Sequence, residues 1–396
     1  MLHRINVYIF CLVGFLVLLG NTAAVPGNDA IVFDLVRTPE PNAHRKRDDT
    51  VAVEQLVQRT SRLGMAVVLE GKKYILNIDT GASTSWIARD DFACYDVGRN
   101  LRSQDFCKMG PGLYEEDFTS IGDFDEAYGT LAEAASGHWA KETIGLGGFD
   151  VEDAPIAFVS SLIWKGDGLT VGIFGLGWDP DDTGGIKSTI WQQLCKKHCL
   201  PVQFTLATNR YEDGEHNAGS IAFGGTLDGQ PVTPDEWVTV DAVPVPQKLD
   251  QWHIDRSELG VVHNGVTTQT EIGQVTLVDS GDPKIRLPQE TFYDIIDMWD
   301  PEPWFHDDTK NWVVDCTAQG PGSVYIEIGG TRFLFPVKDN IVLQYALLDE
   351  GTCLLQLAVG NVLGLPFMRH VIVHHDLEGI KEGKGPKISF KQRVYN

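Results

Sequence analysis

The chain has 396 residues, of which 43% are hydrophobic and 22% are charged, so it can hold two globular domains with full cores. Its formal charge of −23 excludes nucleic acid as an expected partner, because phosphate backbones are bound by surfaces rich in Lys and Arg. An excess of carboxylates repels itself less when some of them are protonated, so the composition favours an acidic working environment.

The first 24 residues have the pattern of an export signal. His3 and Arg4 precede an apolar run at 7–19, and residues 22–24 supply small side chains for cleavage. The run is too short for a membrane span, and the C-terminus lacks the tail of a lipid anchor. We therefore expect a signal peptide over 1–24 and a secreted protein without a membrane anchor. The alternative location is an acidic vacuole.

Residues 25–47 form a polar stretch that ends in Arg45, Lys46 and Arg47. A basic triplet between a signal peptide and the first periodic segment is typical of a processing site, whereas a solvated charge run is the plainer alternative. We predict a pro-segment over 25–47 and hence a zymogen. The mature chain then divides into an N-terminal lobe at 48–235 and a C-terminal lobe at 236–396.

From residue 51 onward the sequence predicts many strands and few helices. Residues 65–70 and 73–79 flank Gly71 as a hairpin, and residues 126–130 and 140–144 form a second, longer one. Further elements of the first half are a short helix at 188–197 and strands at 154–159, 170–175, 203–207 and 220–225. The second half repeats this outline, with a helix at 289–299 and strands at 252–259, 275–279, 325–334 and 354–360. A Pro-rich stretch at 231–246 crosses between the halves.

One pattern occurs twice in the chain. An apolar, β-branched run leads into Asp79-Thr80-Gly81, and another leads into Asp279-Ser280-Gly281, 200 positions later. Each copy is followed by an apolar-apolar-Gly unit, at 173–175 and at 362–364. A strand that ends in a tight glycine turn holds a carboxylate rigidly. The repeat indicates an internal duplication and makes the two aspartates a candidate catalytic pair; the plainer alternative, two aspartates that cap strand ends, does not explain it.

The use of cysteine agrees with export. Cys11 leaves with the signal peptide, and the remaining six are an even number in an oxidising compartment. Six cysteines allow 15 connectivities, among which chain order suggests three pairs: Cys94–Cys107, Cys195–Cys199 and Cys316–Cys353. A metal fragment around Cys195 is the alternative, but no second pair of ligands lies nearby. We expect no metal and no cofactor.

These motifs, in this order and spacing, resemble the pepsin-like aspartic proteases over residues 51–396. Besides the two Asp motifs, the matching segments are Trp86, residues 128–130, 172–175 and 220–225, and the pair Cys316 and Cys353. The resemblance is to a secreted, fungal-type member of the family. It implies an all-β (mainly β) bilobal fold, with two related barrel-like lobes around a cleft. It also implies a monomeric endopeptidase that acts on proteins or peptides and is inhibited by pepstatin.

The resemblance also assigns roles to residues of this sequence. Asp79 and Asp279 would form the catalytic dyad, in which two adjacent carboxyl groups share one proton. The ionised carboxylate would activate a water, and the protonated one would stabilise the oxyanion. The residues that would support the dyad are Thr80, Gly81, Ser280, Gly281 and Asp282. The residues of the flap and the substrate cleft would be Tyr128, Gly129, Thr130, Trp86 and Ile173.

Asp282 and Pro283 depart from the family pattern, which usually has hydroxyl residues at these positions. A hydroxyl at 282 donates a hydrogen bond to the second catalytic carboxylate; an ionised Asp282 cannot donate, but a protonated one can. We therefore expect activity confined to acid pH, and Asp282→Thr to extend it upward. The alternative function, a protease-like protein that binds peptides or partners and cuts little or nothing, rests on this departure. Smaller mismatches are Leu131 after the flap motif, and Leu365 and Pro366 in the second lobe.

Overall fold

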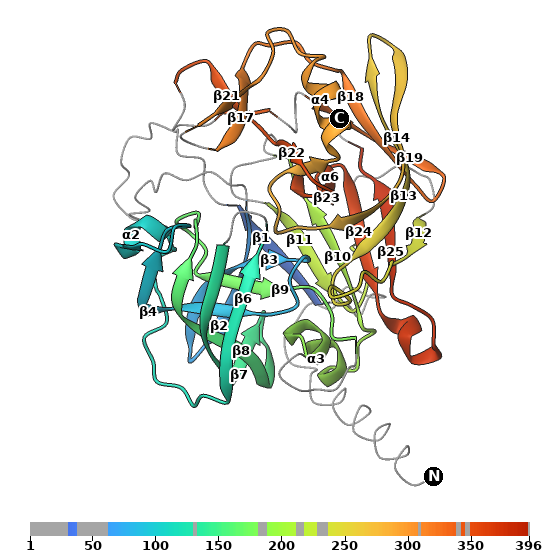
Figure 1. Cartoon of the computed structure of the whole chain (residues 1–396). Coiled ribbons are helices and arrows are strands. Elements are labelled where there is room, and N and C mark those ends of the chain that lie inside the picture. The colour runs from blue at the N-terminus through green and yellow to red at the C-terminus, as the bar shows by residue number, and fades with distance from the viewer. Residues whose placement is uncertain are drawn as a thin grey trace, which may run out of the picture.

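The computed structural model describes residues 31–37, 62–129, 133–180, 188–210, 218–227, 237–307, 310–337, 342–344 and 349–394. The predicted signal peptide, the basic triplet and Thr130 lie outside these residues. Strands dominate the described part of the chain, and its helices are short. In Figure 1 the first half of the chain lies at the lower left and the second half at the upper right, which is the predicted bilobal arrangement.

The first half closes into a barrel. Its strands follow the order β2-β3-β9-β4-β8-β7, and pairing of β2 with β7 completes the ring. Gly71, with φ at 73°, forms the turn of the predicted first hairpin. The elements are β2 (Leu63–Leu69), β3 (Lys72–Asp79), β4 (Trp86–Tyr95), β5 (Leu101–Arg102), α2 (Gln104–Cys107), β6 (Gly122–Tyr128), β7 (Glu133–Leu146), β8 (Phe149–Ile163), β9 (Gly172–Gly175) and α3 (Ile190–Lys197).

The second half is built on a sheet with the order β19-β18-β13-β14-β23-β15-β22, which stays open in the described residues. A smaller sheet with the order β16-β17-β21-β20 lies beside it. The elements are β13 (His253–His263), β14 (Val266–Val278), β15 (Ile285–Leu287), α4 (Gln289–Ile296), β16 (Trp304–His306), β17 (Asn311–Asp315), β18 (Ser323–Ile328), β19 (Thr331–Pro336), β20 (Val342–Gln344), β21 (Thr352–Leu355), β22 (Leu357–Val359), β23 (Val362–Leu363) and α6 (Leu365–Met368).

Strands from both halves meet in a shared antiparallel sheet. Its order is β12-β25-β24-β10-β11-β1, and the pairing of β10 with β24 joins the two halves of the chain. The strands are β1 (Ile31–Arg37), β10 (Gln203–Thr208), β11 (Gly219–Phe223), β12 (Val238–Asp241), β24 (Val371–Asp376) and β25 (Lys387–Gln392), and a 3₁₀ helix (Glu378–Glu382) connects the last two. Part of the predicted pro-segment therefore supplies a strand, because β1 pairs with β11 and β2.

The segment at 325–334, predicted as one strand, is a hairpin. Strands β18 and β19 pair in antiparallel register around Gly329 and Gly330, whose φ angles are 56° and 79°. Two consecutive residues in the left-handed region make a tight two-residue turn, which glycine accepts without steric cost. The pair Gly329-Gly330 is the signal of this turn in the sequence, and the prediction of a single strand overlooked it.

Two of the three predicted disulfides are present, Cys94–Cys107 and Cys316–Cys353. The prediction of Cys195–Cys199 is wrong, because Cys195 is a free thiol. Cys195 points from α3 into the main core and is fully buried, whereas Cys199 follows the helix with φ at 56° and is exposed. Cys199 is itself disulfide-bonded, so it does not pair with the free Cys195.

Candidate active site

The two Asp motifs are built in the same way. Asp79 ends β3, which pairs in parallel with β9 so that Asp79 lies opposite Gly175. The second copy repeats this arrangement, since β14 pairs in parallel with β23 and the backbone N–H of Asp279 donates to Leu363 O at 3.1 Å. Each apolar-apolar-Gly unit is therefore the strand that supports its own aspartate. The repeat seen in the sequence corresponds to a repeated three-dimensional unit.

The turns that follow the two aspartates interlock. The backbone N–H of Thr80 donates to Ser280 Oγ at 3.0 Å, and that of Ser280 donates to Thr80 Oγ1 at 2.9 Å. Each hydroxyl in turn donates across to the other strand, Thr80 to Val278 O and Ser280 to Ile78 O. Thr80 and Ser280 are both fully buried. These four bonds fix the two lobes against each other at the point where the carboxyl groups meet.

Each carboxyl group lies over the glycine of the opposite turn. A Cβ atom on Gly81 would be 2.7 Å from Asp279 Cγ, and one on Gly281 would be 2.5 Å from Asp79 Cγ. The glycines also orient the carboxyl groups, because their backbone N–H groups donate to Asp79 Oδ1 at 2.8 Å and to Asp279 Oδ1 at 2.7 Å. A side chain at either glycine would push the two carboxyl groups out of place.

The two carboxyl groups share a hydrogen bond, and burial raises the pKa of both. The pKa of Asp279 is raised well above its usual value, first by burial and then by the negative charges of Asp79 and Asp282. Burial also raises the pKa of Asp79, but the Asp279 hydrogen bond, the Gly81 N–H and the positive charge of Arg62 oppose this. The two groups therefore share one proton and titrate as a pair.

Asp282 does not make the expected hydrogen bond to Asp279 among the described residues. Its carboxylate instead accepts the backbone N–H of Lys284 at 2.9 Å and pairs with the Arg286 guanidinium. Because both partners are donors, the geometry suits an ionised Asp282. Its charge lies next to the dyad and raises the pKa of both catalytic candidates. Burial, meanwhile, lowers the pKa of Lys284 to about 8.

The predicted flap is the hairpin of β6 and β7. Tyr128 ends β6, and Gly129 follows with φ at 56°. The Tyr128 ring meets Trp164 edge to face at 5.5 Å, and Trp164 meets Trp86 in the same way at 5.3 Å. Burial raises the pKa of the Tyr128 hydroxyl well above 10. Trp86 is fully buried and its side chain lies close to the Tyr128 hydroxyl. Both residues also pack against Trp164, a residue that sequence reasoning did not single out.

The comparisons with known proteins agree with this geometry. The family model of the eukaryotic aspartyl proteases matches residues 66–385. The chain belongs to the eukaryotic aspartyl protease family. A probable aspartic-type endopeptidase of Aspergillus fumigatus is 26% identical over 76% of this chain and 73% of its own length. Candidapepsin of Candida tropicalis is 24% identical over 87% of this chain and 84% of its own length.

A further relative is secreted aspartic protease 3 of Candida albicans, which is 24% identical over 89% of this chain and 88% of its own length. Family membership makes this protein an aspartic-type endopeptidase, as the motifs predicted.

Ile173, which the resemblance placed in the cleft of the protease, is fully buried in the same cluster as Trp86 and Trp164. None of its side-chain surface is open to a substrate in this structure. The reason is its position on β9, between β3 and β4, where Asn77 and Trp86 are its register partners.

A loop before β13 contacts the first Asp turn, and sequence reasoning missed it. Gln251 Nε2 donates to Gly81 O at 2.6 Å, and Ser83 Oγ donates to an Asp250 carboxylate oxygen at 2.5 Å. Asp250 also lies near Glu126 of β6, whose pKa is raised first by burial and then by Asp250. These polar residues border the dyad on the side of the flap strand. They carry no motif, so only spatial proximity reveals them.

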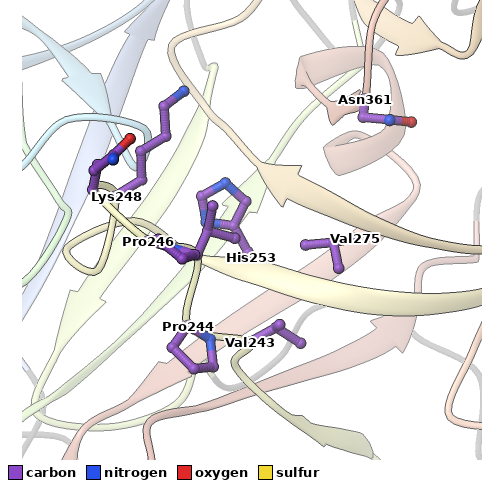
Figure 2. Close-up of a pocket in the computed structure, with 9 residues that line it drawn as sticks. Val243, Pro244, Pro246, Lys248, His253, Val275 and Asn361 are labelled. Carbon is purple, nitrogen blue, oxygen red and sulfur yellow. The ribbon is translucent and has the colours of Figure 1, made fainter.

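A separate pocket of the protease encloses about 570 Å³ and is lined mainly by apolar residues. Figure 2 shows it between the loop at 243–248, His253 of β13 and Val275 of β14. Neither aspartate of the dyad lines it, so it is not the predicted site. Within the described ranges no group of three or more His, Cys, Asp or Glu is placed to hold a metal ion, and no helix there is long and apolar enough to cross a membrane.

Proposed function

We propose that this aspartyl protease is a secreted acid endopeptidase that hydrolyses peptide bonds with a water activated by Asp79 and Asp279. The observation that carries the proposal is the meeting of two carboxyl groups, a buried Asp79 and a partly buried Asp279, across the interlocked turns of the two lobes. Two carboxyl groups in contact and largely shielded from water hold one proton between them, so one acid and one base are available at the same time. The predicted export signal supports secretion.

The two carboxyl groups titrate as a unit and hold one proton between them, because burial raises the pKa of both. We propose that Asp79 acts as the base and Asp279 as the acid. In the reaction, Asp79 removes a proton from a water between the two groups, and the oxygen attacks the peptide carbonyl carbon. Asp279 donates its hydrogen bond to the carbonyl oxygen as negative charge develops there.

The tetrahedral intermediate then collapses. The proton taken up by Asp79 passes to the amide nitrogen, the C–N bond breaks, and the proton shared with Asp279 returns to the dyad. No covalent bond forms between enzyme and substrate in this scheme. The rigid turns at Thr80 and Ser280 keep both carboxyl groups in place throughout, so little reorganisation is needed at the transition state.

The second candidate function is a protein that binds peptides but cuts them slowly or not at all. The specific observation in its favour is Asp282, which pairs with Arg286 and adds a negative charge beside the dyad where a hydroxyl donor was expected. This charge shifts the titration of the dyad but does not disturb the position of either carboxyl group, so we favour the enzyme.

The test is digestion of an unfolded protein between about pH 3 and 7, with and without pepstatin. Asp79→Asn should lower the rate at least about 10³-fold, because it removes the general base. Asp91→Asn is the matched control: the same chemical change is made at an exposed carboxylate that pairs with Arg89 and lies away from the dyad. If correctly folded, processed protein cuts nothing at any pH, the binding function replaces the enzyme.

A further inference from the structure

Arg62 is a buried cation without an anionic partner. It lies directly before β2, and its side chain is only 8% exposed. Nη2 donates to the carbonyl oxygen of Lys165 at 3.1 Å, whereas Nη1 is buried without a hydrogen-bond partner. None of the ion pairs of the described residues includes it. Burying an unpaired charge is costly, so a group of this kind calls for an explanation.

The surroundings of Arg62 place it next to the flap and the dyad. Its guanidinium lies over the Trp164 ring, 4.6 Å from the ring centre. Trp164 is the residue that contacts the flap tyrosine, Tyr128, and the supporting Trp86. The charge of Arg62 also reaches Asp79 and favours its ionised form. Arg62 is therefore buried against Trp164, next to the flap tyrosine, and lies close enough to Asp79 to act on its charge.

We propose that Arg62 binds a carboxylate of the substrate, namely the side chain of a Glu or Asp near the scissile bond. A guanidinium presents parallel N–H groups that match a carboxylate, and stacking on Trp164 fixes its plane in advance. The unused Nη1 donor is then satisfied only when such a substrate is bound. This inference rests on the proposed function, since it concerns which peptides the same site prefers.

The charged groups around Arg62 decide which comparison isolates its effect on substrate binding. Asp79 interacts with it electrostatically, Lys165 offers only its carbonyl oxygen, and the carboxylate of Glu133 accepts the Lys165 N–H at 3.2 Å. A change at Arg62 will therefore also alter the titration of Asp79. Comparing two peptides on the same enzyme at the same pH cancels this effect, because the titration of the dyad acts equally on both.

The experiment uses one peptide sequence with Glu or Gln placed in turn at each position from four before to three after the cut. With the processed wild-type enzyme at about pH 5.5, the kcat/KM ratio of the Glu to the Gln peptide should be about 10 or more at one position. The ratio should fall towards 1 near pH 3, because free Glu has a pKa of about 4.3 and the neutral acid loses the ion pair.

Variants identify the residue responsible. Arg62→Gln should bring the Glu-to-Gln ratio of kcat/KM close to 1 at both pH values. Arg62→Lys should give an intermediate ratio, because lysine keeps the charge but lacks the parallel N–H groups of the guanidinium. Arg102→Gln is the control: Arg102 also stacks on an aromatic ring, Phe106, but is exposed and already pairs with Asp96, so its loss should leave the ratio unchanged.

Three results would overturn the proposal: Gln peptides that are cut with no position favouring Glu, a Glu preference that survives Arg62→Gln, or a preference that does not change between pH 3 and 5.5. These outcomes leave the proposed function intact, because the Gln peptides are still cut. If the wild-type enzyme cuts none of the peptides and no unfolded protein, the proposed function fails, and this inference fails with it.

Discussion

His375 should make this protein less stable in acid. Its imidazole is fully buried in the sheet shared by the two lobes, and neither ring nitrogen has a hydrogen-bond partner. It stacks on Phe204 at 4.2 Å and meets Trp252 edge to face at 4.7 Å. Burial lowers its pKa well below the usual 6.5, and the neighbouring His374 adds to this effect. The folded protein therefore keeps the ring neutral at a pH where the unfolded chain binds a proton.

The size of the effect follows from proton linkage. The contribution of His375 to stability is fully present above about pH 6.5 and is lost as the pH falls from there to the folded-state pKa. At pH 5.5 the loss is about 1.4 kcal/mol, and each further pH unit costs about 1.4 kcal/mol more while the folded ring stays neutral. Replacing His375 by Phe keeps an aromatic ring in the stack and removes this pH dependence.

The assay is urea unfolding of the wild type and His375→Phe at pH 8, 6.5, 5.5 and 4.5. The larger ring of Phe has a cost that does not depend on pH, so the decisive quantity is the change of the stability difference with pH. It should move in favour of the variant by about 1.4 kcal/mol between pH 8 and 5.5. His374→Gln should move it less, because His374 is only partly buried and contacts Thr205 Oγ1 at 2.8 Å. A difference that stays constant over this range refutes the reasoning.

Two further predictions concern the dyad. Asp282→Asn removes a negative charge that raises the pKa of Asp279, so the alkaline limb of the pH–rate profile should move to lower pH. This direction is opposite to the one expected from the sequence, because Asp282 pairs with Arg286. A shift of the alkaline limb to higher pH would contradict this prediction. Ser280→Ala leaves the buried Thr80 N–H and the Ile78 C=O without their hydrogen-bond partner, and should lower the unfolding free energy by about 2–3 kcal/mol. Urea unfolding at pH 7 measures this loss. A loss below about 0.5 kcal/mol would show that the interlocked turns contribute little to stability.

Much of the candidate site follows from local sequence patterns. The apolar runs before Asp79 and Asp279, the glycines after them and the two apolar-apolar-Gly units predicted a duplicated strand-turn unit, and the structure contains this unit twice. These features are readable because strand formation and glycine turns depend mainly on neighbours in the sequence. The hairpin of β6 and β7 was predicted from its local pattern as well. The two disulfides that are present were predicted from the order of the cysteines along the chain.

The missed features depend on side chains that are far apart in the sequence. Nothing near Cys195 shows that α3 turns its thiol into the core and away from Cys199. Nothing near Asp282 states whether its carboxylate will face Asp279 or a guanidinium. The direction in which a side chain points out of its element, and the group that it meets there, are decided by packing rather than by local propensity.

The sequence by itself determined the two-lobed β architecture and the identity of the aspartate pair, because a duplicated pattern of strands and turns encodes both. The tertiary structure alone decided the electrostatics of the site: the loss of water around both carboxyl groups, the stacking of Arg62 on Trp164, and the enclosure of His375 between aromatic rings. The physical reason is that the energy of a charge depends on how much water it loses and which charges lie close to it, and both are properties of the assembled fold.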